Sequence, residues 1–307
     1  FCNSGSCYTT GTDMGDSYLY RVRCVQTECE PGEGGEACPE LCEPTQGEAP
    51  TGPANVFAWA DNGSGTLRSL NLVTGETTLL VSEQSYPLGI ARDATTNTLF
   101  WPSYTQKTIH RRVLPDGPIL SFVTPGDNPG ALAFDSAAQH LYWTETTGGA
   151  LRRSAPDGSW VETVVNGLSF GIGLALDIPQ GKVYWSEETA DLIRRANLDG
   201  TGVESVVSSG LDMPRGIDVV QGFVYWADRG SQTVRRQSVS GGEVEILASG
   251  FTFVQDVDVD ADTQMAYVVD DGIGSPGVIY TVDIETGQKA VLVDGLATPK
   301  HGLLWTE

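Results

Sequence analysis

Three aspartates interrupt apolar segments of this sequence and are the residues best suited to chemistry. Asp218 and Asp258 stand where equivalent earlier segments carry alanine (Ala91, Ala133, Ala175), and Asp256 stands where others carry glycine (Gly89, Gly173, Gly216). Carboxylates that lie close together repel one another unless a cation, a basic neighbour or a proton relieves the repulsion, and Ca²⁺ prefers oxygen ligands of this kind. If the segments converge, the sequence predicts either a calcium ion or a network of salt bridges and water. The basic residues expected to neutralise the carboxylates are Arg215, Lys300 and His301.

Signatures of nucleophilic catalysis are missing from the sequence. None of the three histidines (His110, His140, His301) belongs to a Gly-x-Ser-x-Gly turn or a His-Glu-x-x-His helix. No glycine-rich loop follows a strand and opens a helix, as phosphate binding would require. Only His301, in the last apolar segment, stays a candidate for a functional role. The sequence therefore gives catalysis little support.

The elements that must position these residues are strands in a repeat. An aromatic segment recurs with its Trp at positions 59, 101, 143, 185 and 226, and a weaker copy has Val268 there, so that the spacing is 41 or 42 residues. The copies include Leu141-Tyr142-Trp143-Thr144-Glu145 and Val183-Tyr184-Trp185-Ser186-Glu187. A fixed period of about 40 residues made of short strands is typical of the four-stranded blade of a β-propeller.

We expect each repeat to form four antiparallel strands. Its segments alternate apolar and polar residues and are rich in β-branched residues, and turns such as Asp157-Gly158 and Asp199-Gly200 separate them. The repeat region begins with a second strand at Val56 and ends with a first strand before Trp305. We therefore expect an all-β, six-bladed propeller closed by N- and C-terminal strands that share one blade. The predicted domains are a cysteine-rich segment and linker over residues 1–50 and the propeller over residues 51–307.

The first segment holds every cysteine of the chain, at Cys2, Cys7, Cys24, Cys29, Cys38 and Cys42. An even number confined to a short stretch predicts a disulfide-stapled module, with the pairing open. A zinc site is the alternative, but the segment has no Cys-x-x-Cys pair and no histidine. The expected compartment is oxidising: extracellular, cell-surface or periplasmic. Cys2 also leaves open a lipid anchor.

The charge of the chain limits its partners. A formal net charge of −22 argues against nucleic acid or anionic lipid as a partner, since both require a basic surface. It favours cationic partners instead. No run of 18 apolar residues exists, so the sequence predicts no transmembrane helix.

The aromatic repeats look architectural. Tyr and Trp on one strand point to opposite faces and can pack against different neighbouring blades. The acidic residue that ends the repeat has an arginine seven positions later in four copies, which predicts an ion pair across the hairpin. The predicted pairs are Asp61–Arg68, Glu145–Arg152, Glu187–Arg194 and Asp228–Arg235.

Residues 54–307 resemble the six-bladed YWTD propellers of the low-density-lipoprotein receptor group. The resemblance rests on Tyr-Trp-Thr-Glu at 142–145, Tyr-Trp-Ser-Glu at 184–187 and Tyr-Trp-Ala-Asp at 225–228. No copy reads Tyr-Trp-Thr-Asp in full, and the cysteine-rich segment comes before the propeller, which favours a divergent relative such as a bacterial one. The resemblance implies an extracellular binding or scaffolding module without catalysis and without a required cofactor.

Propellers bind through the loops that join strands two and three and those that lead into the next blade. In this chain, aromatic and charged residues on these loops suit a protein or peptide ligand. The candidate binding residues are Tyr86, Tyr104, Asp127, Phe170, Glu188, Asp212, Arg229 and Phe253, with Asp191 and Asp271 beside them. The alternative function is a calcium-dependent hydrolase or lyase resembling six-bladed lactonases, with the metal in the channel at Asp218, Asp256 and Asp258.

Overall fold

Every aromatic repeat forms the second strand of one four-stranded antiparallel sheet. The computed structural model describes residues 2–3, 6–13, 16–22, 55–123 and 126–306, and side chains from residue 55 onward. Contacts between Cα atoms divide the chain into two units, residues 1–51 and 52–307. The first unit contains a sheet in the order β1 (Cys2–Asn3), β2 (Ser6–Asp13) and β3 (Asp16–Val22). Four of the six cysteines and the side chains of Cys2 and Cys7 lie outside the described residues, so the disulfides stay a prediction.

The second unit consists of six such sheets, which we number as blades from inner to outer strand. Blade 1 is β27 (Pro299–Trp305), β4 (Val56–Asp61), β5 (Thr66–Asn71) and β6 (Thr77–Val81). Blade 2 is β7 (Ala91–Asp93), β8 (Thr98–Ser103), β9 (Thr108–Val113) and β10 (Leu120–Val123). Blade 3 is β11 (Pro129–Asp135), β12 (His140–Glu145), β13 (Ala150–Ser154) and β14 (Val161–Asn166).

The remaining blades repeat this order. Blade 4 is β15 (Gly171–Asp177), β16 (Lys182–Glu187), β17 (Leu192–Asn197) and β18 (Glu204–Val207). Blade 5 is β19 (Pro214–Val220), β20 (Phe223–Asp228), β21 (Thr233–Ser238) and β22 (Glu245–Ser249). Blade 6 is β23 (Val254–Asp260), β24 (Met265–Asp270), β25 (Gly277–Asp283) and β26 (Lys289–Leu296).

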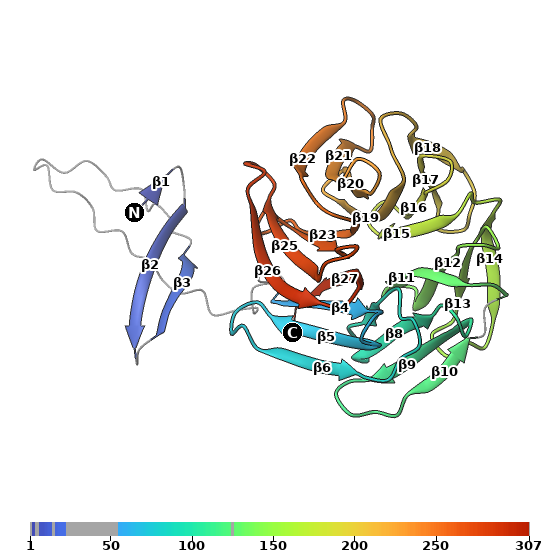
Figure 1. Cartoon of the computed structure of the whole chain (residues 1–307), viewed down its shortest axis with the longest axis horizontal. Coiled ribbons are helices and arrows are strands. Elements are labelled where there is room, and N and C mark those ends of the chain that lie inside the picture. The colour runs from blue at the N-terminus through green and yellow to red at the C-terminus, as the bar shows by residue number, and fades with distance from the viewer. Residues whose placement is uncertain (1, 4–5, 14–15, 23–54, 124–125, 307) are drawn as a thin grey trace, which may run out of the picture. The chain divides into compact units, whose positions relative to one another are not determined.

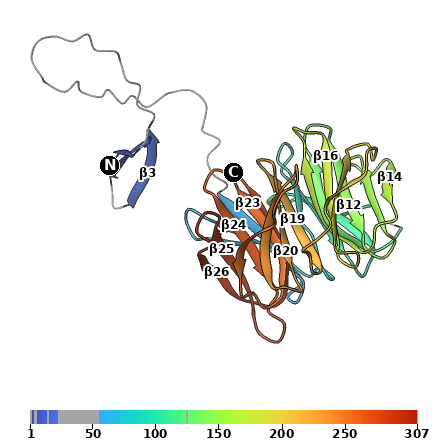
Figure 2. The same cartoon turned by 90° about the horizontal axis from the view of Figure 1, so that it is seen from above.

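The six blades form a ring, with the first strand of each blade toward the centre and the fourth at the rim (Figure 1). Turned by 90°, the strands of blade 6 lie beside β19 and β20 of blade 5 (Figure 2). The six four-stranded sheets confirm the all-β, six-bladed propeller predicted from the repeat.

In the described part of the chain, no helix is long and apolar enough to cross a membrane.

The core lies between blades and is built from the aromatic strand. Trp143 packs with Phe100 and Leu132 at the junction of blades 2 and 3, whereas its neighbour Tyr142 packs with Trp185 at the junction of blades 3 and 4. Adjacent residues of one strand point to opposite faces, so each blade contributes to two interfaces. This confirms that the motif is architectural.

The chain closes the ring in the predicted way. The C-terminal strand β27 pairs antiparallel with the first strand of the repeat region, β4, and places Gly302 opposite Trp59 and Leu304 opposite Phe57. Blade 1 therefore contains both ends of the propeller, which ties the ring shut.

The acidic residue at the end of the aromatic strand forms three of the four predicted ion pairs. Their N–O distances are 3.1, 3.3 and 3.7 Å in Arg152–Glu145, Arg194–Glu187 and Arg235–Asp228. The partners are diagonal neighbours rather than opposite residues, because Arg152 lies across from Trp143. No Asp61–Arg68 pair occurs among the described ion pairs. Asp61 instead accepts the backbone N–H groups of Ala297 and Thr298, which bring the closing segment to this carboxylate.

Candidate functional site at the channel mouth

One residue from each blade surrounds one end of the central channel. These six residues, the channel mouth, are Leu88, Gly130, Ile172, Arg215, Gln255 and Lys300. Together with Ala131, Gly216 and His301, they line a cavity of about 30 Å³. The residue just before each of them pairs with the last residue of the aromatic strand. In blade 5, for example, Pro214 pairs with Asp228 and precedes Arg215, and in blade 2 Pro87 pairs with Ser103 and precedes Leu88. The register then shifts by a bulge in blades 1 and 3 to 6, and such bulges redirect a side chain.

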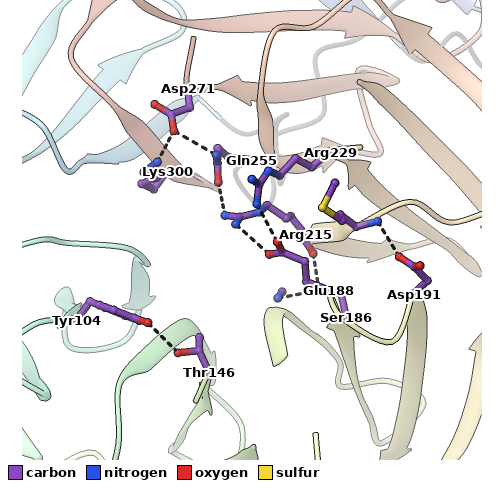
Figure 3. Close-up of polar contacts among 12 residues, drawn as sticks. Tyr104, Thr146, Ser186, Glu188, Asp191, Arg215, Arg229, Gln255, Asp271 and Lys300 are labelled. Atoms are coloured by element: carbon purple, nitrogen blue, oxygen red, sulfur yellow. Dashed lines mark hydrogen bonds and ion pairs between the residues drawn. The ribbon is translucent and has the colours of Figure 1, made fainter. Parts of the chain in front are cut away.

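The mouth is divided into two halves. Blades 2, 3 and 4 contribute small or apolar residues, and blades 5, 6 and 1 contribute Arg215, Gln255 and Lys300. The polar half forms one continuous network (Figure 3). At its centre Glu188 lies 2.9 Å from Arg215 Nη2 and 2.8 Å from Arg229 Nη1.

The network continues across blade 6 to the closing strand. Arg215 Nη1 donates to Gln255 Oε1 at 2.6 Å, and Gln255 Nε2 donates to Asp271 Oδ2 at 3.2 Å. The same carboxylate oxygen pairs with Lys300 Nζ. Burial lowers the pKa of the Arg215 guanidinium, and the charge of Glu188 opposes that shift. The network therefore holds three cations and two carboxylates in a chain that is otherwise strongly acidic.

Aromatic rings border both halves. The guanidinium carbon of Arg229 lies 4.0 Å from the centroid of the Phe253 ring, within the range of a cation–π contact. On the apolar side the rings of Tyr86 and Tyr104 are 5.6 Å apart, and Thr146 Oγ1 lies 3.5 Å from the Tyr104 hydroxyl. Tyr86 is 42 % exposed, so this side offers apolar surface to a partner.

The loops at the mouth are fixed by the acidic residue of the aromatic motif. Asp270 accepts the backbone N–H groups of Thr252 and Phe253 at 2.7 and 2.6 Å, and Glu187 accepts that of Ser169 at 2.8 Å. Carboxylates that accept backbone N–H groups form strong, charge-assisted hydrogen bonds. The motif thus has a second role that its sequence did not reveal, since its acidic residue holds the loop that precedes the inner strand in blades 1 and 3 to 6.

The structure brings together only part of the predicted binding set. Glu188, Arg229 and Phe253 meet in the polar half, and Tyr86 and Tyr104 meet in the apolar half. The other three residues take no part in the side-chain contacts described for the two halves. Asp127 binds Lys107 and Thr147, and Asp212 lies beside Gly230. Phe170 touches the polar half through its backbone, since its carbonyl accepts the Glu188 N–H.

The sequence did not indicate Gln255, and it predicted the wrong partners for Arg215 and Lys300. Arg215 and Lys300 were expected to neutralise the channel aspartates, but they pair with Glu188 and Asp271 at the mouth. His301 is the expected partner that does face the aspartates, with Nδ1 3.6 Å from Asp256 Oδ2. An alignment of the six repeats could have identified Arg215, Gln255 and Lys300. They occupy the position that Leu88, Gly130 and Ile172 occupy in the other three blades.

Asp218, Asp256 and Asp258, the carboxylate cluster, line a second cavity of about 210 Å³ further along the channel. The opposite wall is apolar and includes Leu132, Ala133 and Leu174. Burial raises the pKa of Asp256 to about 6, although the charge of His301 opposes this. Burial also raises the pKa of Asp218 and, together with the charges of Asp218 and Asp256, that of Asp258.

Calcium binding by this cluster stays a prediction. Each carboxylate gives one oxygen to a backbone N–H of a neighbouring inner strand. No group of three or more His, Cys, Asp or Glu side chains has the arrangement of a metal site in the part of the chain that the structure describes. The donor set therefore fits hydrogen bonding between strands better than the six to eight oxygen ligands of Ca²⁺.

Gly216 makes room for the Asp256 carboxylate, and its substitution tests this packing. A Cβ atom added at Gly216 would lie 1.7 Å from Asp256 Oδ1. We expect Gly216→Ala to reduce the free energy of unfolding by about 1–3 kcal/mol, the usual range for overpacking. Urea denaturation measures the loss. Gly126→Ala is the matched control, because the nearest atom there is 3.6 Å away; equal losses in both variants would contradict the expectation.

Solved structures of other proteins share the fold of this chain, although its sequence matches no known family. No protein-family model matches the sequence, and no curated protein matches it either. Among solved structures, the chain is similar to one in the crystal structure of the Nidogen/Laminin complex, with TM-score 0.73, 16 % identity, and coverage of 81 % of this chain and 97 % of that one. It is also similar to TolB from Acinetobacter baumannii, with TM-score 0.69, 13 % identity, and coverage of 82 % and 67 %.

A third similar structure is a gluconolactonase from Xanthomonas campestris, with TM-score 0.59, 17 % identity, and coverage of 71 % of this chain and 82 % of that one. At such identities the likeness establishes the six-bladed propeller and leaves its function open.

Proposed function

We propose that this chain is a non-catalytic binding module that holds a protein or peptide ligand at the channel mouth and its surrounding loops. The observation that carries the proposal is the divided mouth, where Glu188, Arg215 and Arg229 form a charged network on one side and exposed Tyr86 borders the other. Aromatic anchors beside arginines are the residues that dominate protein interfaces.

The charges suggest how a partner is attracted and then held. A net charge of −22 draws a cationic partner from a distance. The guanidinium groups and Lys300 at the mouth instead supply hydrogen-bond donors at short range, so they favour a carboxylate or carbonyl group on the part of the partner that enters.

We further propose that the propeller is a divergent YWTD propeller of the low-density-lipoprotein receptor group and acts outside the cell or in the periplasm. Tyr-Trp followed by a small residue and an acidic one ends three aromatic strands, β12, β16 and β20. The cysteine-rich first segment supports an oxidising compartment.

Exposed apolar residues at two equivalent loop positions allow a direct test. Tyr86 and Met213 are both exposed and both have φ near +55°. We expect the double variant Tyr86→Asn, Met213→Asn to weaken partner binding at least tenfold, because it removes the apolar contact while asparagine suits the left-handed backbone. The measurement is biolayer interferometry with the protein that the intact propeller captures from the native extracellular fluid.

The control is Trp160→Ala, which removes an exposed ring from a turn between strands three and four, at the opposite end of the blade from the mouth loops. Its affinity should match that of the parent. If the control loses binding and the double variant keeps it, the binding surface lies on the other face.

A second candidate is a calcium-dependent hydrolase or lyase. The observation in its favour is the 210 Å³ cavity with three carboxylates in its wall, together with the likeness in fold to a gluconolactonase. This alternative requires stoichiometric calcium in the purified protein that Asp258→Ala removes.

A further inference from the structure

A lysine ammonium group is held between blades 5 and 6 by two carbonyl groups and two aromatic rings. Lys289 Nζ, on the outer strand β26 of blade 6, donates to the carbonyl oxygens of Ser249 and Gly250 at 3.2 and 2.9 Å. The same atom lies 4.3 Å from the centroid of the Phe251 ring and 4.7 Å from that of the Tyr280 ring, within the range of cation–π contacts. The two rings meet edge to face, with centroids 5.6 Å apart, so they form two walls of one corner.

The three side chains of this contact all depart from the repeat. Phe251 follows a glycine where three other copies carry leucine, and Tyr280 stands where four other blades carry arginine. Lys289 pairs with Val282 at a position that holds an uncharged residue in blades 1 and 3. The equivalent residues are Leu168, Leu211 and Leu296, then Arg68, Arg152, Arg194 and Arg235, and finally Thr77 and Val161. Because the three departures converge on one atom, they indicate a site rather than the common packing of the blades.

No carboxylate neutralises this ammonium group. Among the described residues, the lysines that pair with a carboxylate are Lys107 and Lys300, and Lys289 is not one of them. A primary ammonium has three N–H donors, of which the two carbonyl oxygens accept two, while the ring faces attract its charge. Gly250 lies between the two carbonyl groups with a left-handed backbone (φ +74°) that glycine adopts most readily. The arrangement therefore suits a primary ammonium group.

Other junctions between blades are fastened by arginines of the third strand. In blades 2, 3 and 4 each of these arginines donates to a backbone carbonyl group of the next blade; they are Arg111, Arg153 and Arg195. Arg236 has the equivalent position in blade 5, yet it binds Glu245 and lies over the Phe223 ring in its own blade. Lys289 reaches from blade 6 back to blade 5 and so fastens this junction from the opposite side.

We propose that the Phe251 and Tyr280 rings and the Ser249 and Gly250 carbonyl groups, together the ammonium site, are a binding site for a primary ammonium group that Lys289 fills as a tethered ligand. The walls of the site come from other residues, and Phe251 is only 3 % exposed. Shortening Lys289, which is itself exposed, therefore leaves the walls in place and opens them to a free alkylammonium ion. The ammonium site shares no residue with the channel mouth, so it is separate from the binding function proposed above.

Lys289→Ala provides the test, because it removes the part of the side chain that n-propylammonium reproduces. Scanning calorimetry compares the parent and the variant in sodium, n-propylammonium and tetramethylammonium chloride at equal concentration. We expect the variant to unfold about 2–4 °C below the parent in sodium chloride, the shift usual for losing one stabilising contact in a domain of this size. The n-propylammonium salt should restore about half of that loss or more by binding the folded state. Tetramethylammonium has no N–H donor for the carbonyl groups and should restore none.

Two further variants locate the effect. Lys107→Ala, at an exposed lysine that pairs with Asp127, is the matched control, and n-propylammonium should shift its midpoint no more than that of the parent. Phe251→Leu, added to Lys289→Ala, introduces the leucine of the other copies and should abolish the rescue.

Four results would overturn the proposal. They are an unchanged midpoint for Lys289→Ala, an equal response of parent and variant to n-propylammonium, an equal rescue by tetramethylammonium, and a rescue that persists with Phe251→Leu. If Lys289→Ala does not fold, Lys289→Met keeps most of the aliphatic stem and removes the charge. Its midpoint should still lie below that of the parent, and an equal midpoint or failure of both variants to fold would count against the ammonium site.

Discussion

Trp185→Ala should lower the free energy of unfolding by about 3–5 kcal/mol, the range for removing a large buried aromatic side chain. Trp185 is completely buried and packs between blades 3 and 4 with Tyr142, Leu151 and Leu174. Its indole N–H also donates to Glu187 Oε1 at 3.0 Å. The variant therefore creates a cavity at a blade interface and removes a donor from a buried carboxylate.

Urea denaturation followed by circular dichroism measures this loss. Trp160→Ala is the matched control, since this tryptophan is 39 % exposed and its removal should cost less than about 1 kcal/mol. A similarly small change for Trp185→Ala would mean that the two blades repack around the gap, and would contradict a rigid inter-blade core.

Glu188→Ala should have the second largest effect, with a loss of about 2–4 kcal/mol in the free energy of unfolding. Breaking a buried ion pair by removing one partner costs about 3–5 kcal/mol, and residual solvent access reduces that figure. Glu188 is 12 % exposed and neutralises both Arg215 and Arg229. Its removal leaves two guanidinium groups near each other without the carboxylate that pairs with both, and it breaks the network that shapes the channel mouth.

Two variants separate charge from packing at this site. Glu188→Gln keeps the shape and one hydrogen-bond acceptor, so its loss should be smaller than that of Glu188→Ala. Asp116→Ala removes a carboxylate that is 93 % exposed and 3.8 Å from Arg112; an exposed pair of this kind contributes less than about 1 kcal/mol. Equal losses for Glu188→Ala and Asp116→Ala in urea denaturation would show that the mouth network is not a buried charge cluster.

For the binding function proposed above, the consequence is that the mouth is preorganised. Asp270 and Glu187 hold the preceding loops through their backbone N–H groups, and Glu188 holds two arginines from blade 5. Binding surfaces that are fixed before the partner arrives lose less conformational entropy on association. Substitutions at Glu188 should therefore weaken partner binding as well as stability.

The sequence by itself determined the architecture. A period of 41 or 42 residues and an aromatic strand in each copy predicted six blades, and the order of strands at the two ends predicted the pairing of β27 with β4. These features are local or periodic, so they can be read along one strand or one hairpin. The same holds for Glu145–Arg152, whose spacing around a single turn brings the two side chains together.

Only the tertiary structure decided which residues meet at the channel mouth and in the channel. Arg215, Gln255 and Lys300 belong to three different blades and are brought together by closure of the ring. Asp61 was predicted to bind an arginine and binds backbone N–H groups of residues 297 and 298 instead, and the channel aspartates likewise bind the next inner strand. The physical reason is that nearly every residue has a backbone N–H group, so the sequence does not show which of them lies near a given carboxylate. Whether the carboxylate binds a backbone N–H or a cationic side chain depends on the distances between blades, and these are set when the ring closes.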